Sequence, residues 1–173
     1  MSIPGTTTDD QLKIVTILSS KVPQDGWIVE VGCLHGRQSV HICEYKDTSV
    51  MLTCIDPFPE SSTTEHNISY TKMDWINNTK SYNNVNMVRG LSPPNIAFLQ
   101  FEKQVDLVIL DINDVLDSLD FWNTHLKSGG TIVVHTYNEG GIFPKIENSV
   151  LSYAVGDSFL VDNRHHSVIL VKQ

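Results

Sequence analysis

Five short apolar runs recur along the chain, and each is followed by a segment with the spacing of an amphipathic helix. Apolar runs without alternation are typical of parallel strands that are covered on both faces, and the intervening helices supply the crossovers. Two more runs at the end of the chain predict an antiparallel hairpin. The sequence therefore predicts an α/β fold with a doubly wound, mostly parallel sheet of seven strands. The expected strands are WIVEV (27–31), VMLTCID (50–56), VNMVRG (85–90), VDLVILD (105–111), TIVVHTY (131–137), SFLVD (158–162) and SVILVKQ (167–173).

The local sequence also predicts where several helices between the strands begin and end. A helix is expected over 114–127, with Gly129 and Gly130 ending it, and another over 93–101 that begins with proline. The polar segment 60–84 is long for a connection; we expect one short helix over 69–80 within it. This segment is either a mobile lid over the end of the second strand or an ordinary connection.

Length and composition restrict the class of protein. A chain of 173 residues without a linker or repeat predicts a single domain over 1–173. The formal charge is −8 and Lys and Arg form no cluster, so we expect neither nucleic acid nor an anionic membrane as partner. Three cysteines without a CxxC pair, and no secretion signal or long apolar run, predict a cytoplasmic protein.

The stretch IVEVGCLHGRQSV (28–40) leads from the first strand into a helix through two glycines, Gly32 and Gly36. In a doubly wound sheet, ligands bind at the carboxyl ends of the strands, and a helix N-terminus there offers unpaired amides to an anion. One interpretation is that the glycines allow a ligand to approach closely. The other is that they only shape the corner, because a GxxxG pattern is common.

Three acids mark the carboxyl ends of three expected strands. Glu30 lies in an otherwise apolar strand, where a charge is costly unless it meets a polar partner. Asp56 follows Gly32 by 24 residues, close to the spacing of about 20 at which an acid binds a ribose. Asp111 ends the fourth strand. Each acid alone is more often an exposed cap, but together they predict one site.

These motifs, in their order, resemble those of a known family. VEVGCLHG, CIDPF, VRGLS, VDLVILD and LKSGGTIVVHTY, which span Trp27 to Tyr137, are similar to the successive motifs of class I S-adenosylmethionine-dependent methyltransferases. The forms GCLHGRQS and LKSGG most resemble the small-molecule O-methyltransferases of the macrocin type. The resemblance implies a Rossmann-like fold, S-adenosyl-L-methionine as cofactor, and methyl transfer to an oxygen atom of a small-molecule acceptor.

The resemblance also implies roles for individual residues. The glycine turn would surround the methionine part of the cofactor, and Asp111 would lie near its amino group. Asp56 would bind the ribose hydroxyls. Residues that follow the second and third strands would border the adenine. The implied cofactor-binding residues are Glu30, Gly32, Cys33, Leu34, Gly36, Asp56, Pro57, Leu91, Ser92 and Asp111.

The acceptor chemistry departs from the family pattern. His135, at the end of the fifth strand, is the candidate base, and Asp111 is the other candidate catalytic residue; alternatively His135 only forms hydrogen bonds within the protein. Thr136 stands where the family often has an acid, and the loop after Asp111 looks shortened, so we expect no catalytic metal. The alternative function is a methyltransferase-like protein that binds the cofactor without transferring a methyl group. A nicotinamide-binding domain is a weaker third interpretation.

Overall fold

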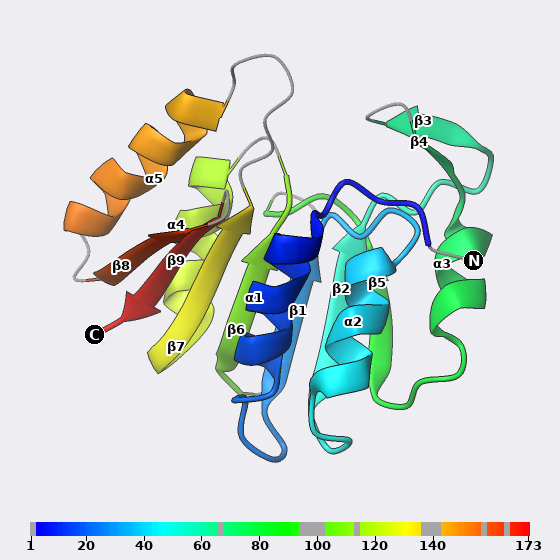
Figure 1. Ribbon diagram of the computed structural model, residues 1–173, viewed down its shortest axis with the longest axis horizontal. Coiled ribbons are helices and arrows are strands. Elements are labelled where there is room, and N and C mark those ends of the chain that lie inside the picture. Colours follow the sequence, from blue (N-terminus) through cyan, green and yellow to red (C-terminus); the bar gives the residue numbers. More distant parts are fainter. Residues whose placement is uncertain are drawn as a thin grey trace.

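One twisted sheet of seven strands organises the chain (Figure 1). The computed structural model describes residues 3–65, 68–93, 103–112, 115–135, 143–156, 159–164 and 167–173. The first five strands in spatial order are parallel, and the last two run antiparallel to their neighbours, so the predicted seven-stranded sheet with its closing hairpin is confirmed. The spatial order is β5 (Val85–Arg89), β2 (Met51–Asp56), β1 (Trp27–Val31), β6 (Val105–Leu110), β7 (Leu126–His135), β9 (Ser167–Lys172) and β8 (Phe159–Arg164).

Helices cover both faces of the sheet, as Figure 1 shows. On one face lie α1 (Asp9–Ser19) and α2 (Arg37–Tyr45), with α3 (Lys72–Thr79) beside α2; on the other lie α4 (Val115–His125) and α5 (Phe143–Gly156). No helix in the described part of the chain is long and apolar enough to cross a bilayer.

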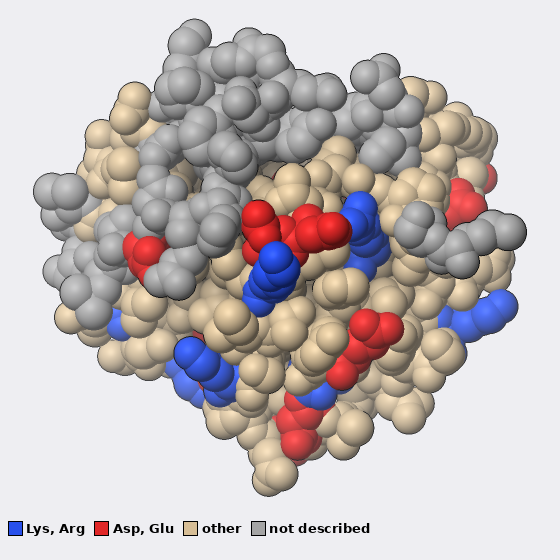
Figure 2. All heavy atoms as spheres, viewed as in Figure 1, with Lys and Arg blue, Asp and Glu red and all other residues tan. Residues whose placement is uncertain are grey.

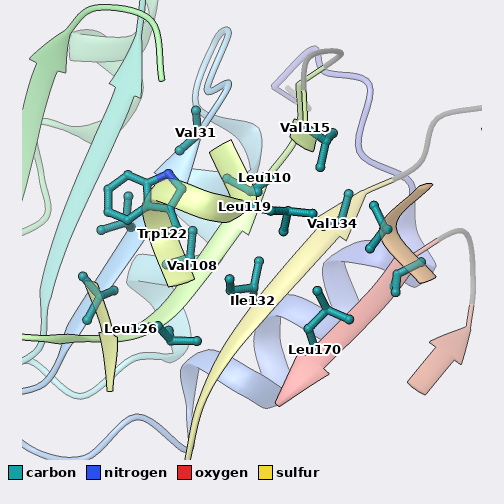
Figure 3. Packing of buried hydrophobic residues seen from close by; sticks show 14 of the residues in the cluster. Val31, Val108, Leu110, Val115, Leu119, Trp122, Leu126, Ile132, Val134 and Leu170 are labelled. Carbon is teal, nitrogen blue, oxygen red and sulfur yellow. The ribbon is translucent and has the colours of Figure 1, made fainter. Parts of the chain in front are cut away.

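Strand side chains alternate between two hydrophobic cores, one under each helical layer. In β1, Ile28 packs with the core beneath α1 and α2, whereas its neighbour Val29 packs with the core beneath α4 and α5. Figure 3 shows the second core, where Trp122 and Leu119 of α4 lie over strands β6 and β7. Trp122 is fully buried in this core. Because helices cover both faces, the central strands β1, β2 and β6 are mostly apolar, whereas the edge strand β5 also carries the exposed residues Asn86 and Arg89.

Two expected boundaries differ from the structure. The helix predicted over 114–127 ends at His125, and Leu126–Gly130 already belongs to β7. Leu126 pairs with Val105, and the register then shifts before Leu107 meets Thr131. Gly129, with φ of +76°, therefore lies in an irregular strand start instead of ending the helix. The helix expected over 93–101 lies outside the described residues, apart from Pro93.

The polar segment 60–84 contains more structure than its sequence predicts. The expected short helix is present as α3, whose N-terminus has a capping box between Thr71 and Asp74. Before it, β3 (Thr63–Glu65) and β4 (Ile68–Tyr70) form a separate two-stranded hairpin. These strands are three residues each, too short for an apolar alternation to predict them.

Both glycines of the turn after β1 are needed for packing. Gly32 and Gly36 have φ of +86° and +85°, a left-handed backbone that favours glycine. A Cβ on Gly32 would lie 2.2 Å from the carbonyl oxygen of Asp111, and one on Gly36 would lie 2.9 Å from Cδ1 of Trp75. Neighbouring protein groups therefore account for both glycines, without a ligand.

We predict that Gly36→Ala lowers the free energy of unfolding more than Gly129→Ala does. Both alanines are placed at a positive φ, which costs about 1–2 kcal/mol. Only the alanine at 36 also meets Trp75, since nothing lies within 4 Å of a Cβ at 129, and such overpacking costs about 1–3 kcal/mol more. Urea unfolding of both variants measures the difference, and equal losses would contradict the packing role of Gly36.

Candidate functional site

The strand register brings the predicted site residues to one edge of the sheet. Glu30 pairs with Cys54 of β2 and with Ile109 of β6, and Ile109 pairs with Val133 of β7. Two residues further along these strands come Asp56, Asp111 and His135. The structure thus brings together, on neighbouring strand ends, residues that lie up to 79 positions apart in the sequence.

Glu30 lies one layer below this edge and is fully buried. Its carboxyl oxygens accept hydrogen bonds from Gln38 Nε2 at 3.2 Å and from Ser39 Oγ at 2.6 Å, both on α2. Ser39 Oγ in turn accepts a hydrogen bond from Trp75 Nε1 at 3.1 Å. Burial raises the pKa of Glu30 to about 8, although these hydrogen bonds oppose the shift. Glu30 is therefore mostly protonated at neutral pH.

His135 is the other end of this buried polar chain. Its ring is 3% exposed, with Nε2 at 2.7 Å from Gln38 Oε1 and Nδ1 at 2.9 Å from Ser167 Oγ. An amide oxygen only accepts, so Nε2 carries the proton and the Ser167 hydroxyl donates to Nδ1. Burial lowers the pKa of His135 to about 4, so the ring is neutral at physiological pH. The role of His135 as a base stays a prediction, and it requires this network to open.

The Asp56 carboxylate connects the glycine turn to the end of β2 through hydrogen bonds. Oδ2 accepts hydrogen bonds from the backbone N–H groups of Cys33 at 2.8 Å and Leu34 at 3.1 Å. Oδ1 accepts from the backbone N–H of Phe58 at 2.9 Å and from the hydroxyl of Tyr70 at 3.2 Å. Asp56 is 3% exposed. Asp56, which the sequence predicts to bind a ribose, thus stabilises the turn by accepting hydrogen bonds from it.

A pocket lies between the glycine turn and the N-terminal segment. One side is formed by Pro4 to Thr7, and the hydroxyls of Thr6 and Thr7 both lie 3.5 Å from Asp111 Oδ2. The other side includes five of the predicted cofactor-binding residues together with two residues of α2. These seven residues are Glu30, Gly32, Cys33, Leu34, Arg37, Gln38 and Asp111.

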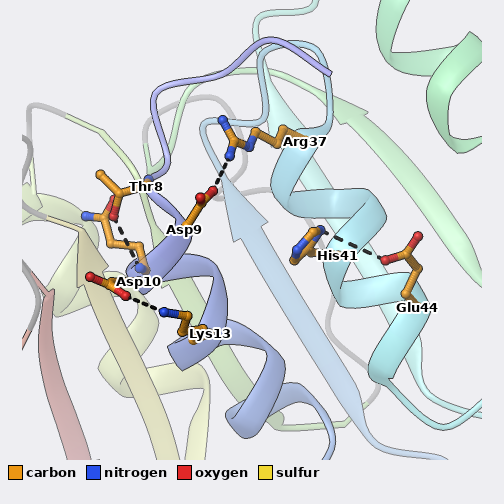
Figure 4. Close-up of polar contacts among 8 residues, drawn as sticks. Thr8, Asp9, Asp10, Lys13, Arg37, His41 and Glu44 are labelled. Atoms are coloured by element: carbon orange, nitrogen blue, oxygen red, sulfur yellow. Dashed lines mark hydrogen bonds and ion pairs between the residues drawn. The ribbon is translucent and has the colours of Figure 1, made fainter. Parts of the chain in front are cut away.

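An ion pair holds the N-terminal segment over this pocket. Arg37 Nη2 lies 2.7 Å from Asp9 Oδ1 at the start of α1 (Figure 4). The Asp9 side chain is 84% exposed, and ion pairs of such exposed groups contribute only about 0–1 kcal/mol. This contact is therefore weak enough for a ligand to replace it.

The predicted adenine-binding residues lie on the other side of the turn. Pro57 is exposed and Leu91 is 53% exposed at the surface, whereas Ser92 is fastened to α4, because its Oγ accepts a hydrogen bond from Trp122 Nε1 at 3.0 Å. Phe58 is fully buried against Trp75, with ring centroids 5.3 Å apart, so only Pro57 of the Pro57–Phe58 pair is available to a ligand.

One group of described residues has donor atoms close enough to hold a metal ion. The carboxylate of Glu30 and the sulfurs of Cys33 and Cys54 all lie within 4.8 Å of one another. Burial raises the pKa of both thiols, so they remain protonated, and a metal would have to displace these protons. These donors would suit a soft ion rather than Mg²⁺. This group therefore does not test the prediction that no catalytic metal is bound.

The sequence did not assign functions to three residues that complete the site. Gln38 and Ser39 hold Glu30, and Tyr70 holds Asp56. A signal for the first two exists, since polar residues on the first turn of α2 face a charged residue in β1. Tyr70 comes from the hairpin that the sequence did not predict, so no pattern indicated its contact.

Comparisons with known proteins identify the family of the chain. A family model described as a methyltransferase domain matches residues 29–137, which is more than half of the chain. The chain therefore belongs to this family of methyltransferase domains, as its motifs predicted. No curated protein sequence matches the chain.

Solved structures show the same fold at low sequence identity. The precorrin-6y C5,15-methyltransferase from Geobacter metallireducens has a TM-score of 0.73 at 13% identity, over 96% of this chain and 90% of that one. The O-methyltransferase TomG from Streptomyces achromogenes, solved with S-adenosylmethionine, has a TM-score of 0.73 at 14% identity, over 96% and 81%. A structure titled as a putative rRNA methylase from Clostridium thermocellum has a TM-score of 0.66 at 12% identity, over 97% of both chains. The Rossmann-like fold is thus confirmed.

We predict that the protonation of Glu30 makes the protein less stable as pH rises. The folded-state pKa of about 8 exceeds the ordinary value of 4.5, so this contribution is complete below pH 4.5 and lost as pH rises through 8. His135 acts in the opposite direction, but only between about pH 4 and its ordinary value of 6.5. Between pH 6.5 and 8, only Glu30 of these two residues therefore changes the free energy of unfolding.

Urea unfolding at both ends of this window tests the prediction. The free energy of unfolding of the unmodified protein should fall by about 1–2 kcal/mol more than that of Glu30→Gln, since each pKa unit corresponds to about 1.4 kcal/mol. Equal changes in the two proteins would show that Glu30 is not protonated in the folded state.

Proposed function

We propose that the chain transfers a methyl group from S-adenosyl-L-methionine to an oxygen atom of a small molecule. The observation that carries the proposal is the pocket beside the glycine turn, where Asp111 and Arg37 supply one negative and one positive side chain. These charges suit the ammonium and carboxylate groups of an α-amino acid. The O-methyltransferase title of a structural neighbour with S-adenosylmethionine bound supports the same ligand.

The rest of the cofactor would extend across the turn toward Asp56. The ribose would meet Asp56, and the adenine would lie against the exposed side chains of Pro57 and Leu91, beside Ser92. The pocket is closed on its outer side by Pro4 to Thr7. Binding therefore requires this segment to move, which the weak ion pair between Arg37 and Asp9 permits.

In this proposal the protein accelerates the reaction mainly by aligning the acceptor with the methyl group of the cofactor. The cofactor carries its methyl group on a sulfonium, and an in-line displacement needs an aligned acceptor and exclusion of water. Asp111 lies at the pocket, where it would orient the acceptor hydroxyl or the cofactor's amino group. His135 would accept the hydroxyl proton only after its bonds to Gln38 and Ser167 open.

Surface charge favours a small-molecule acceptor. On the face in Figure 2, the Lys and Arg side chains of described residues are dispersed among acidic ones. With a net charge of −8, such a surface would attract a nucleic-acid backbone weakly. The second candidate function is cofactor binding without methyl transfer. The burial of His135 and its hydrogen bond to Gln38 favour this alternative.

Calorimetry with S-adenosylhomocysteine tests the ligand. We expect binding in the micromolar range, and Asp111→Asn and Arg37→Gln should each weaken it about tenfold, because each removes a charged partner worth about 1.5–3 kcal/mol. Asp120→Asn, an exposed acid on α4, is the matched control and should bind as the unmodified chain does. A flat trace from folded protein would refute the proposal.

Product formation separates the two candidate functions. We expect the chain to convert S-adenosylmethionine to S-adenosylhomocysteine when it is supplied with a set of small hydroxyl compounds. EDTA should leave this activity unchanged, because no catalytic metal is expected. Cofactor binding with no turnover of any acceptor would instead support the binding protein, and activity that EDTA abolishes and Mg²⁺ restores would refute the metal-free site.

A further inference from the structure

A carboxyl group and two thiols meet beneath the glycine turn. Glu30 of β1 pairs with Cys54 of β2, so both side chains point to the same face of the sheet, and Cys33 follows in the turn after β1. Glu30 and Cys54 are fully buried, and Cys33 is 4% exposed. Strand pairing and the turn therefore hold the three side chains in place.

The spacing of their donor atoms is close to that of zinc ligands. The Glu30 carboxyl oxygen and the sulfurs of Cys33 and Cys54 lie within 4.8 Å of one another, and Cys54 Sγ lies 3.4 Å from Glu30 Oε2. In a tetrahedral Zn²⁺ site, bonds of about 2.3 Å to sulfur and about 2.1 Å to oxygen place the ligand atoms about 3.6–3.8 Å apart. The donor atoms would therefore approach one another by about 1 Å at most to bind an ion.

An ion would replace hydrogen bonds that the two thiols donate, and thiols are weak donors. The Cys54 thiol donates to Glu30 Oε2, and it also lies 3.6 Å from Ser39 Oγ. The Cys33 sulfur lies 3.5 Å from the backbone carbonyl oxygen of Ile55 and 3.6 Å from that of Glu30. Zinc binds the thiolate form, so each thiol loses its proton. The lone pair of Oε2 that accepted from Cys54 then becomes available to the ion.

The hydrogen bonds that orient a ligating carboxylate are already present. Gln38 Nε2 and Ser39 Oγ, both on α2, donate to Glu30 at 3.2 Å and 2.6 Å. Gln38 is itself held by His135, whose Nε2 lies 2.7 Å from Gln38 Oε1. Ligating carboxylates in metal sites are hydrogen-bonded in this way, and such contacts raise the affinity for the metal.

We propose that Glu30, Cys33 and Cys54 bind one Zn²⁺ ion beside the pocket. Glu30 and Cys33 line this pocket, so an ion would enter from it, and a water molecule would complete the four ligands. The ion would join β1, β2 and the glycine turn, and would thus stabilise the turn. Neither candidate catalytic residue, Asp111 or His135, belongs to the group. The inference therefore goes beyond the proposed function and does not depend on it.

Cobalt binding to the reduced chain tests the donors directly. Co²⁺ takes the place of Zn²⁺ in tetrahedral sites and absorbs light through charge transfer from thiolate ligands. We expect one Co²⁺ per chain with this absorption, and Zn²⁺ should abolish it by displacing Co²⁺. Folded, reduced protein that shows no thiolate absorption with Co²⁺ would overturn the inference.

Substitutions separate this group from the other cysteine and from the histidines. Cys33→Ser and Cys54→Ser should each weaken Zn²⁺ binding at least about a hundredfold, because loss of a residue that only orients a ligand already costs about 10- to 100-fold. Glu30→Gln keeps the shape of the side chain and should weaken binding at least about tenfold. Cys43→Ser is the matched control, because this half-buried cysteine on α2 lies outside the group, and its affinity should be that of the unmodified chain.

Competition with a chelator of known affinity measures Zn²⁺ binding in each variant. Unchanged affinity in Cys33→Ser and Cys54→Ser would place the ion elsewhere and refute the site. Thermal unfolding confirms that each variant is folded.

Proton release in the unmodified chain tests the site if the cysteine variants do not fold. Each thiol that binds Zn²⁺ loses a proton, so we expect release of at least about two protons per ion near neutral pH. Calorimetry in buffers of different ionisation enthalpy counts these protons, and release of about one proton or none would overturn the inference. If Zn²⁺ binds as expected but S-adenosylhomocysteine does not, this inference stands and the proposed function fails.

Discussion

The hydrogen bonds of the Asp56 carboxylate set the shape of the whole candidate site. One side chain joins the turn after β1, the turn after β2 and the hairpin strand β4. Leu34 and Phe58, on either side of it, have φ of +46° and +42°, conformations that non-glycine residues adopt rarely. Hydrogen bonds to a buried carboxylate offset that backbone cost. The site is therefore built around an anion that the protein itself supplies.

A second buried element links the helical layer to the sheet beside this turn. Trp75, Ser39, Glu30, Gln38, His135 and Ser167 form a continuous chain of hydrogen bonds. It runs from α3 through α2 and across the sheet to β9. Neutral forms of both ionisable members lower the desolvation cost of burying them. The same burial removes His135 from solvent, so the network that orders the site also restrains its most reactive side chain.

The two halves of the candidate site are closed by different segments. Residues 4–7 lie over the side near Asp111, and Tyr70 covers the acceptor positions of Asp56. Both segments lie outside the seven-stranded sheet, but Thr7 and Tyr70 are buried, so these segments are packed against the site as well as hydrogen-bonded to it. A ligand that reaches these positions must therefore displace packed side chains as well as hydrogen bonds.

Much of the fold follows from patterns that are local in the sequence. Apolar runs and helical spacing predicted the strands of the sheet, the helices on its faces and the positions of Asp56 and Asp111 at strand ends. The shift of the β7 start to Leu126 was not predictable, because it depends on pairing with Val105 across the sheet. The β3–β4 hairpin was also missed, since strands of three residues are too short to carry a periodic signal.

By itself the sequence determined the class of fold and the family, and it predicted the sheet edge at which the candidate site lies, because periodicity, glycine spacing and strand-end acids are local features of the chain. Only the tertiary structure decided what each acid does. Glu30 is buried against α2, and Asp56 holds the turn together with Tyr70. The environment of a carboxylate depends on the donors that the fold brings to it, and these donors come from segments distant in sequence. Burial and hydrogen bonding therefore decide the protonation and availability of these groups, which no local pattern encodes.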